Sequence, residues 1–270
     1  MRLRLVFAVA AGFTAAAFGA RADQLADVKA KGQLVCGTLG TADPFSFQDP
    51  KTRDIVGYDI DICRKVADAL GVRLEIKPMA VEARIPELTQ GRVDILAANL
   101  GYTKERAQQI DYSYSYFVSL QKIVVTKELG VTSFAQLAGK KVTAIKGSTS
   151  EQGVRRLIPN AQTVTFQDQS AAFLALTQDK VDAFCASELN LVKLVQQSKA
   201  VPLVIINQTL FVEPWGLGLR RNEPAFKEAV NKALSDLDRS GEADRIFTRW
   251  FGDGTVYNIK RDFKIEEIKD

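Results

Sequence analysis

The sequence GYDIDICRKVADAL, residues 57–70, decides the fold. Apolar side chains recur in it at helical spacing, which predicts an amphipathic helix over Tyr58–Leu70. Asp59 and Asp61 open this helix, where negative charge complements the unpaired backbone amides of a helix N-terminus. A catalytic carboxylate pair is disfavoured, because side chains two positions apart do not converge on one helix face. The stretch is therefore interpreted as structural.

Short apolar strands alternate with amphipathic helices on both sides of this helix. The first set comprises strands at Gln33–Thr38, 73–77 and 93–97 and helices at Tyr58–Leu70 and 82–90. A second set follows residue 127, with strands at 142–145, 163–166, 181–186 and 201–206 and helices at 151–157, 170–177 and 189–198. Two more helices, Pro224–Arg239 and Glu242–Phe251, close the chain. This alternation favours mostly parallel sheets covered by helices.

The two sets predict two α/β lobes with a cleft between them. No Gly/Ser-rich or low-complexity tract separates the sets, so ordered strands rather than a flexible tether should join them. The candidates are two apolar, extended stretches at 117–125 and 212–219. We expect lobe 1 to comprise residues 23–120 and 213–270 and lobe 2 to comprise residues 121–212.

Composition excludes several classes of function. The 270 residues are 46% hydrophobic and 25% charged, ordinary values for a globular protein. They include no histidine, which excludes a Ser-His-Asp or Cys-His nucleophile, a histidine metal ligand and a histidine pH switch. The three cysteines form no C-x-x-C pair, so neither a zinc nor an iron–sulfur site has a ligand set. We expect no metal and no cofactor.

The first 22 residues have the pattern of a secretory signal. Two arginines precede an apolar run from Leu5 to about Phe18, and Ala20-Arg21-Ala22 supplies a small-x-small cleavage site. The net charge is +4, but three of the positive charges lie in this segment and the remainder carries only +1. A nucleic-acid partner is therefore not expected. Export would place the mature protein outside the inner membrane.

That compartment is oxidising, and three cysteines permit at most one disulfide. Cys36 and Cys185 lie in apolar runs typical of strands, which favours buried free thiols at both positions. The sequence leaves open whether Cys36 and Cys63 meet.

Further motifs give the chain a family resemblance from about residue 25 to residue 252. GYDIDI at 57–62 is accompanied in order by PFSF at 44–47, RIPEL at 84–88, TKER at 103–106, GKKV at 139–142 and RWFG at 249–252. With these motifs the chain resembles the extracellular solute-binding proteins of family 3, the polar amino-acid receptors of bacterial ABC importers. The resemblance implies a two-lobe periplasmic binding protein fold of type II with the crossover strands as hinge. It also implies a monomer that passes an amino acid to an inner-membrane permease.

The resemblance places the ligand's α-carboxylate on Arg106, whose planar guanidinium fork matches a carboxylate. Asn99 and Gly101 resemble the loop that hydrogen-bonds the ligand, although relatives often carry hydroxyl residues there. On the opposing lobe, Ser148 and Thr149 open a helix whose free amides would close onto the same carboxylate.

The ligand's remaining groups are less clearly matched. Relatives usually pair the α-ammonium with an Asp at the position of Ser187, so either the neighbouring Glu188 reaches the cleft or the ligand lacks an ordinary amino group. Arg84 resembles the arginine that acidic amino-acid receptors place beside the distal carboxylate. Gln169 and Asp43 are further candidates for the pocket. A glutamate- or aspartate-like ligand is therefore the leading expectation.

A second function is an enzyme on the same scaffold. Some relatives resemble periplasmic cyclohexadienyl or arogenate dehydratases, in which a carboxylic acid in the cleft serves as general acid. Glu188, beside the altered position Ser187, would be that acid here.

Overall fold

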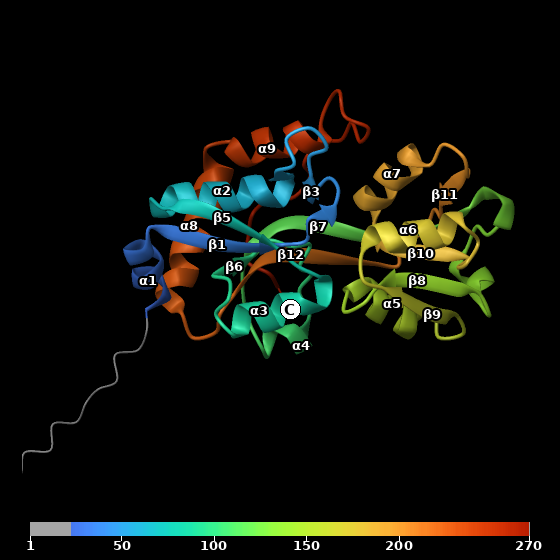
Figure 1. The fold of residues 1–270 in the computed structure, drawn as a ribbon, viewed down its shortest axis with the longest axis horizontal. Helices are drawn as coiled ribbons and strands as arrows, with labels where there is room; N and C mark the ends of the chain where they lie inside the picture. The colour runs from blue at the N-terminus through green and yellow to red at the C-terminus, as the bar shows by residue number, and fades with distance from the viewer. Residues whose placement is uncertain (1–22, 270) are drawn as a thin grey trace, which may run out of the picture.

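The computed structural model describes residues 23–269 (Figure 1). Nine strands form one sheet in the order β5-β1-β6-β12-β7-β10-β8-β9, with β11 paired to β7, and β2, β3 and β4 form a small separate sheet. The signal segment expected over residues 1–22 lies outside the described residues. Among residues 23–269, no helix has both the length and the apolar character needed to cross a membrane.

Lobe 1 is the left half of Figure 1 and is built on three parallel strands. These strands are β1 (Gln33–Thr38), β5 (Arg73–Pro78) and β6 (Ile95–Leu96). The helices of this lobe are α1 (Gln24–Lys31), α2 (Tyr58–Leu70), α3 (Arg84–Thr89), α4 (Lys104–Ala107), α8 (Pro224–Arg239) and α9 (Glu242–Phe251), with a short 3-10 turn at Val81–Ala83. Its small antiparallel sheet consists of β2 (Thr41–Ala42), β3 (Ser46–Gln48) and β4 (Ile55–Val56).

Lobe 2 repeats the pattern on the right of Figure 1. Its parallel strands are β8 (Lys141–Ile145), β9 (Gln162–Phe166) and β10 (Ala183–Ser187), and β11 (Leu203–Ile205) pairs with β7. The helices are α5 (Thr149–Leu157), α6 (Gln169–Thr177) and α7 (Glu188–Gln197), with 3-10 turns at Lys127–Leu129 and Phe134–Leu137.

Two antiparallel strands cross between the lobes. They are β7 (Asp111–Thr126) and β12 (Phe211–Leu219), and they pair over most of the length of β12. The crossover strands expected at 117–125 and 212–219 are thus present, and β7 begins six residues earlier than expected because its first part pairs with the end of β12. Both strands are hydrogen-bonded within the main sheet, so the junction is ordered.

Each lobe has its own apolar core. In lobe 1, aromatic rings from distant parts of the chain pack around Phe45, with Phe117 and Trp215 edge to face and Phe251 tilted. Lobe 2 has two apolar clusters, which divide the side chains of β8, β10 and the second half of β7 between them. Separate cores allow each lobe to keep its structure if the angle between the lobes changes.

The helix α2 is fixed by the residues that open it. Gly57 precedes α2 with a φ of 140°, and an added Cβ would lie 2.1 Å from the carbonyl oxygen of Phe45. Asp59 accepts hydrogen bonds from the Asn99 amide (3.1 Å) and the Tyr116 hydroxyl (2.9 Å). Asp61 accepts from Trp250 Nε1 at 2.8 Å. The two carboxylates therefore connect α2 to three other segments, in addition to facing its N-terminus.

The cysteines differ in part from the expectation. Cys36 in β1 forms a disulfide with Cys63 in α2, so the prediction of a free thiol at Cys36 was wrong. The reason is packing, because α2 covers β1 and brings together side chains 27 residues apart. Cys185 is a buried free thiol, as expected, and burial raises its pKa to about 12.

Candidate ligand-binding cleft

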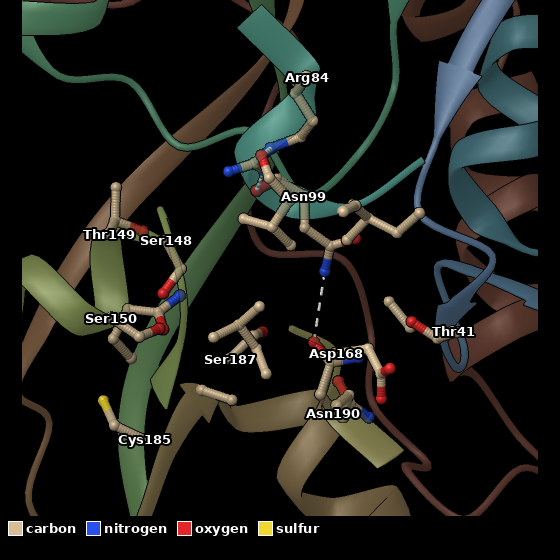
Figure 2. A pocket seen from close by; sticks show the side chains of 18 of the residues that line it. Thr41, Arg84, Asn99, Ser148, Thr149, Ser150, Asp168, Cys185, Ser187 and Asn190 are labelled. Carbon is tan, nitrogen blue, oxygen red and sulfur yellow. Dashed lines mark hydrogen bonds between the residues drawn. The ribbon is translucent and has the colours of Figure 1, made fainter. Parts of the chain in front are cut away.

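A cavity of about 260 Å³ lies between the lobes and beside the crossover strands. Figure 2 shows Arg84 and Asn99 of lobe 1 opposite Ser148, Ser187 and Asn190 of lobe 2. Six of the residues expected from the sequence line this cavity: Arg84, Asn99, Ser148, Thr149, Gln169 and Ser187. Four expected residues, Asp43, Gly101, Arg106 and Glu188, are not among the lining residues.

Arg84 begins α3 and is only 3% exposed. Its Nε donates to the Val81 carbonyl at 2.8 Å, and its Nη1 donates to the carbonyls of Ala98 (2.7 Å) and Asn99 (3.0 Å). Within residues 23–269, its Nη2 has only a long contact, 3.5 Å to the carbonyl of Gly147. Burial, with repulsion from the nearby Arg106, lowers the pKa of Arg84 to about 9. Nη2 is thus the donor that remains for an anion in the cavity.

Arg106 lies in the short helix α4, which Thr103 caps by accepting a hydrogen bond from the Arg106 amide. Its Nη1 donates to the Gly101 carbonyl at 2.8 Å, and its Nη2 donates to the Gly147 carbonyl of lobe 2 at 2.9 Å. The guanidinium is buried behind the cavity wall and connects the two lobes. In this arrangement both ends of its fork are occupied by backbone carbonyls.

The loop before α4 is held in place by polar contacts. Asn99 has a φ of 50°, a conformation that asparagine tolerates better than most residues. Its side chain donates to Asn190 Oδ1 across the cleft at 3.3 Å, the dashed line in Figure 2. Asn190 in turn donates to the Asp43 carbonyl at 2.9 Å. Gly101, two residues after Asn99, forms an isolated antiparallel β-bridge with Trp215 of β12.

On lobe 2, Ser148 caps the helix α5. Ser148 Oγ accepts from the Glu151 amide at 3.1 Å, while the Glu151 carboxylate accepts from the Gly147 amide at 2.8 Å. The Glu151 carboxylate therefore binds the amide of Gly147, the residue before the cap residue Ser148. Thr149 and Ser150 follow and line the cavity.

Gln169 begins α6 at the cavity wall. The preceding residue, Asp168, caps that helix by accepting from the Ala171 amide at 2.9 Å.

Two of the expected acidic residues are held outside the cavity. Glu188, the first residue of α7, forms an ion pair with Lys122 of β7 at 2.6 Å and does not line the cavity. The shifted loop considered for Glu188 is therefore not observed. Asp43 is paired with Lys193 at 3.6 Å, and burial raises the pKa of Asp43.

A buried polar network crosses the floor of the cleft, and the sequence reasoning missed most of it. Ser187 is hydrogen-bonded to Ser119 Oγ at 3.0 Å, and Ser119 accepts from Gln121 Nε2 at 3.0 Å. Gln121 Nε2 also donates to Glu213 Oε1 at 2.9 Å, and its Oε1 accepts from Ser150 Oγ at 2.7 Å. A signal for it existed, because Gln121 and Glu213 are polar residues inside runs otherwise typical of buried strands.

Comparison with solved structures defines the class of protein. The chain is similar to an ancestral arginine-binding protein bound to glutamine, with 36% identity and a TM-score of 0.78 over 82% of this chain and 99% of that chain. It is also similar to AncCDT-1, an ancestral amino acid-binding protein described as a precursor of cyclohexadienyl dehydratase (30% identity, TM-score 0.79, 84% and 99% covered). The fold is therefore the two-lobe, type II periplasmic binding protein fold, with β7 and β12 as hinge strands.

The family follows from the sequence comparisons. Residues 34–253 match the model of the bacterial extracellular solute-binding proteins, family 3, and the chain belongs to this family. Among its relatives is the glutamine-binding protein GlnH of an ABC transporter in Bacillus subtilis, 31% identical over 232 residues, which are 84% of each chain. Other relatives are named as binding proteins for cystine, for arginine and for glutamate and aspartate. These named relatives are solute-binding proteins rather than enzymes.

Proposed function

We propose that this protein is the periplasmic solute-binding component of an amino-acid ABC importer. The observation that supports this most is the cavity between the lobes, whose polar lining comes from both lobes and from the hinge strands. A ligand that contacts both walls favours the closed form, because only that form supplies all its hydrogen-bond partners. The lobe boundaries expected from the sequence, at 120/121 and 212/213, fall within the two hinge strands.

Within this class, an acidic amino acid is the proposed ligand. Two buried guanidinium groups, those of Arg84 and Arg106, stand beside the cavity, and Arg84 Nη2 is available to an anion. The turn at Ser148 and Thr149 adds further donors on the opposite wall. Arg106 remains the proposed anchor of the α-carboxylate, which requires that the ligand replace at least one of its two carbonyl partners.

The test is isothermal titration calorimetry of the mature protein, residues 23–270, with the twenty amino acids and cystine. The expected result is saturable one-to-one binding, tightest for L-glutamate or L-aspartate, with a rise in melting temperature. Tight binding of a neutral or basic amino acid would reject the proposed acidic specificity but leave the receptor function standing. Absence of binding throughout the panel would reject the receptor function.

The enzymatic alternative depended on Glu188 as a general acid in the cleft. Glu188 is instead paired with Lys122 and does not line the cavity, so it is not placed to act as a general acid on a bound ligand. We therefore advance no enzymatic function.

A further inference from the structure

The helix α7 of lobe 2 contacts one residue of lobe 1, Asp43, at two points. Asn190 Nδ2 donates to the Asp43 carbonyl at 2.9 Å, and Lys193 Nζ lies 3.6 Å from the Asp43 carboxylate. Asn190 and Lys193 are three positions apart in the helix, so they lie on the same face of it. Asn190 also accepts from Asn99 Nδ2 at 3.3 Å. One face of α7 thus contacts two separate segments of lobe 1.

Both ends of this connection are fixed within their own lobes. In α7, Leu191 and Leu194 are buried in an apolar core of lobe 2. In lobe 1, the two residues after Asp43 are attached to the start of α2, because the carbonyls of Pro44 and Phe45 accept from the first two amides of that helix at 3.1 and 2.9 Å. When the lobes move apart, the contacts between Asp43 and α7 therefore have to lengthen or break.

The ion pair lies outside the ligand cavity. Among the described residues that line the cavity, neither Asp43 nor Lys193 occurs. A ligand can therefore fill the cavity without displacing the pair, whereas it has to replace a carbonyl partner of Arg106. The pair is also partly shielded, with side-chain exposures of 22% for Asp43 and 29% for Lys193. It can hold the lobes together both with and without a ligand.

We propose that α7 is a ligand-independent clamp, in which Asn190 and Lys193 hold Asp43 and favour the closed form of the receptor before a ligand enters. This inference rests on the proposed receptor function and adds a determinant of affinity outside the cavity. The apparent dissociation constant is the intrinsic one divided by the fraction of molecules in the binding-competent form. A weaker clamp lowers that fraction, so it lowers the affinity for every ligand by the same factor.

The first experiment measures the arrangement of the lobes without a ligand. Spin labels are attached through Arg64→Cys on α2 and Gln196→Cys on α7, which are exposed positions in different lobes. Double electron–electron resonance then gives the distribution of distances between the labels. Adding Lys193→Gln and Asn190→Ala should shift this distribution towards longer distances, because both contacts to Asp43 are weakened. A distribution that matches the one with the clamp intact would overturn the proposal.

The second experiment measures affinity by calorimetry for the two amino acids of the panel that bind most tightly. Lys193→Gln and Asp43→Asn each remove the ion pair and leave the cavity lining unchanged. We expect each to weaken the binding of both ligands by the same factor, about threefold. The two substitutions together should weaken binding no further, because they remove one shared interaction. Circular dichroism checks that every variant is folded.

Matched controls come from the ion pair between Lys232 and Asp236, which lies within α8. Lys232→Gln and Asp236→Asn make the same charge changes inside one lobe and should bind as the wild type does. Unequal losses for the two ligands would indicate a direct ligand contact, and additive losses would indicate two independent effects. Either result would overturn the clamp, as would unchanged affinity.

The two experiments separate failure of the clamp from failure of the receptor function. A wild type that binds no member of the panel would contradict the receptor function, but the distances between the lobes would still decide whether α7 holds Asp43. A receptor that binds an amino acid and shows no change in these distances would retain its proposed function and lose the clamp.

Discussion

At the scale of single residues, Asp59 connects the sequence motif to the binding loop. Its carboxylate holds the Asn99 amide, and Asn99 lines the cavity. Burial raises the pKa of Asp59 to about 7, although the hydrogen bonds from Asn99 and Tyr116 oppose the shift. A residue that the sequence suggests only as a helix-opening acid therefore also positions the ligand loop.

The raised pKa makes stability depend on pH. The unfolded chain loses this proton near pH 4, whereas the folded protein keeps it up to about pH 7. The folded state thus binds more protons in this interval, so the free energy of unfolding should fall as pH rises, by on the order of 1–3 kcal/mol from this group. Asp59→Asn should be less stable than the wild type at pH 5, with a difference that shrinks towards pH 8. Urea unfolding at both pH values measures this, and parallel pH profiles would contradict it.

Arg106 is the residue on which the proposed function most depends. Arg106→Ala removes the guanidinium that spans from Gly101 to Gly147, and with it the proposed carboxylate anchor. We expect at least a hundredfold loss of affinity for L-glutamate, about 2.7 kcal/mol, in a protein that remains folded. Arg155→Ala, on an exposed part of α5, should bind as the wild type does. Calorimetry with circular dichroism distinguishes these outcomes, and an Arg106→Ala affinity within threefold of the wild type would reject the anchor.

At the scale of elements, the strongly periodic segments were predictable from the sequence. The bounds of β1, α2, α8 and α9 agree with the prediction, because local spacing alone identifies an amphipathic helix or a strand. The strand expected at 93–97 is reduced to Ile95–Leu96, since the chain leaves the sheet to form the ligand loop. The small sheet of β2 to β4 was not predicted, because its strands are two or three residues long.

The site was predictable where it follows a motif and unpredictable where it depends on register. Ser148 and Thr149 open a helix with a recognisable cap. Glu213 and Gln121, by contrast, meet only because β12 and β7 pair with Glu213 opposite Ser119. Sequence spacing carries no information about that register, which tertiary packing decides.

The disulfide between β1 and α2 gives a prediction at this scale. It closes a loop of 27 residues, for which chain entropy predicts a stabilisation of about 3.5 kcal/mol. Replacing both Cys36 and Cys63 by Ala should lower the melting temperature, and dithiothreitol should then have no further effect. Cys185→Ser, at the buried free thiol, should retain the sensitivity to dithiothreitol that the wild type shows. A wild-type melting curve unchanged by the reductant would contradict the role of the disulfide.

At the scale of the whole molecule, two lobes with separate cores are joined by two hinge strands and by polar contacts across the cleft. Arg106 reaches the Gly147 carbonyl, Asn99 reaches Asn190, and Lys146 pairs with Glu82 at 2.7 Å. The last pair is exposed and contributes little on its own. Asp43 of lobe 1 adds contacts to Asn190 and Lys193 of lobe 2. A bound ligand can supplement these contacts between the lobes.

A ligand held by both lobes should protect backbone amides on both sides of the cleft. Hydrogen exchange with and without L-glutamate should slow at 97–106 in lobe 1 and at 145–150 in lobe 2, because each segment borders the cavity. The strand β9, at the far edge of the sheet, provides the internal control and should change little beyond the general gain in stability. Protection confined to one of the two segments would mean that the ligand binds a single lobe, and closure around it would then have no energetic basis.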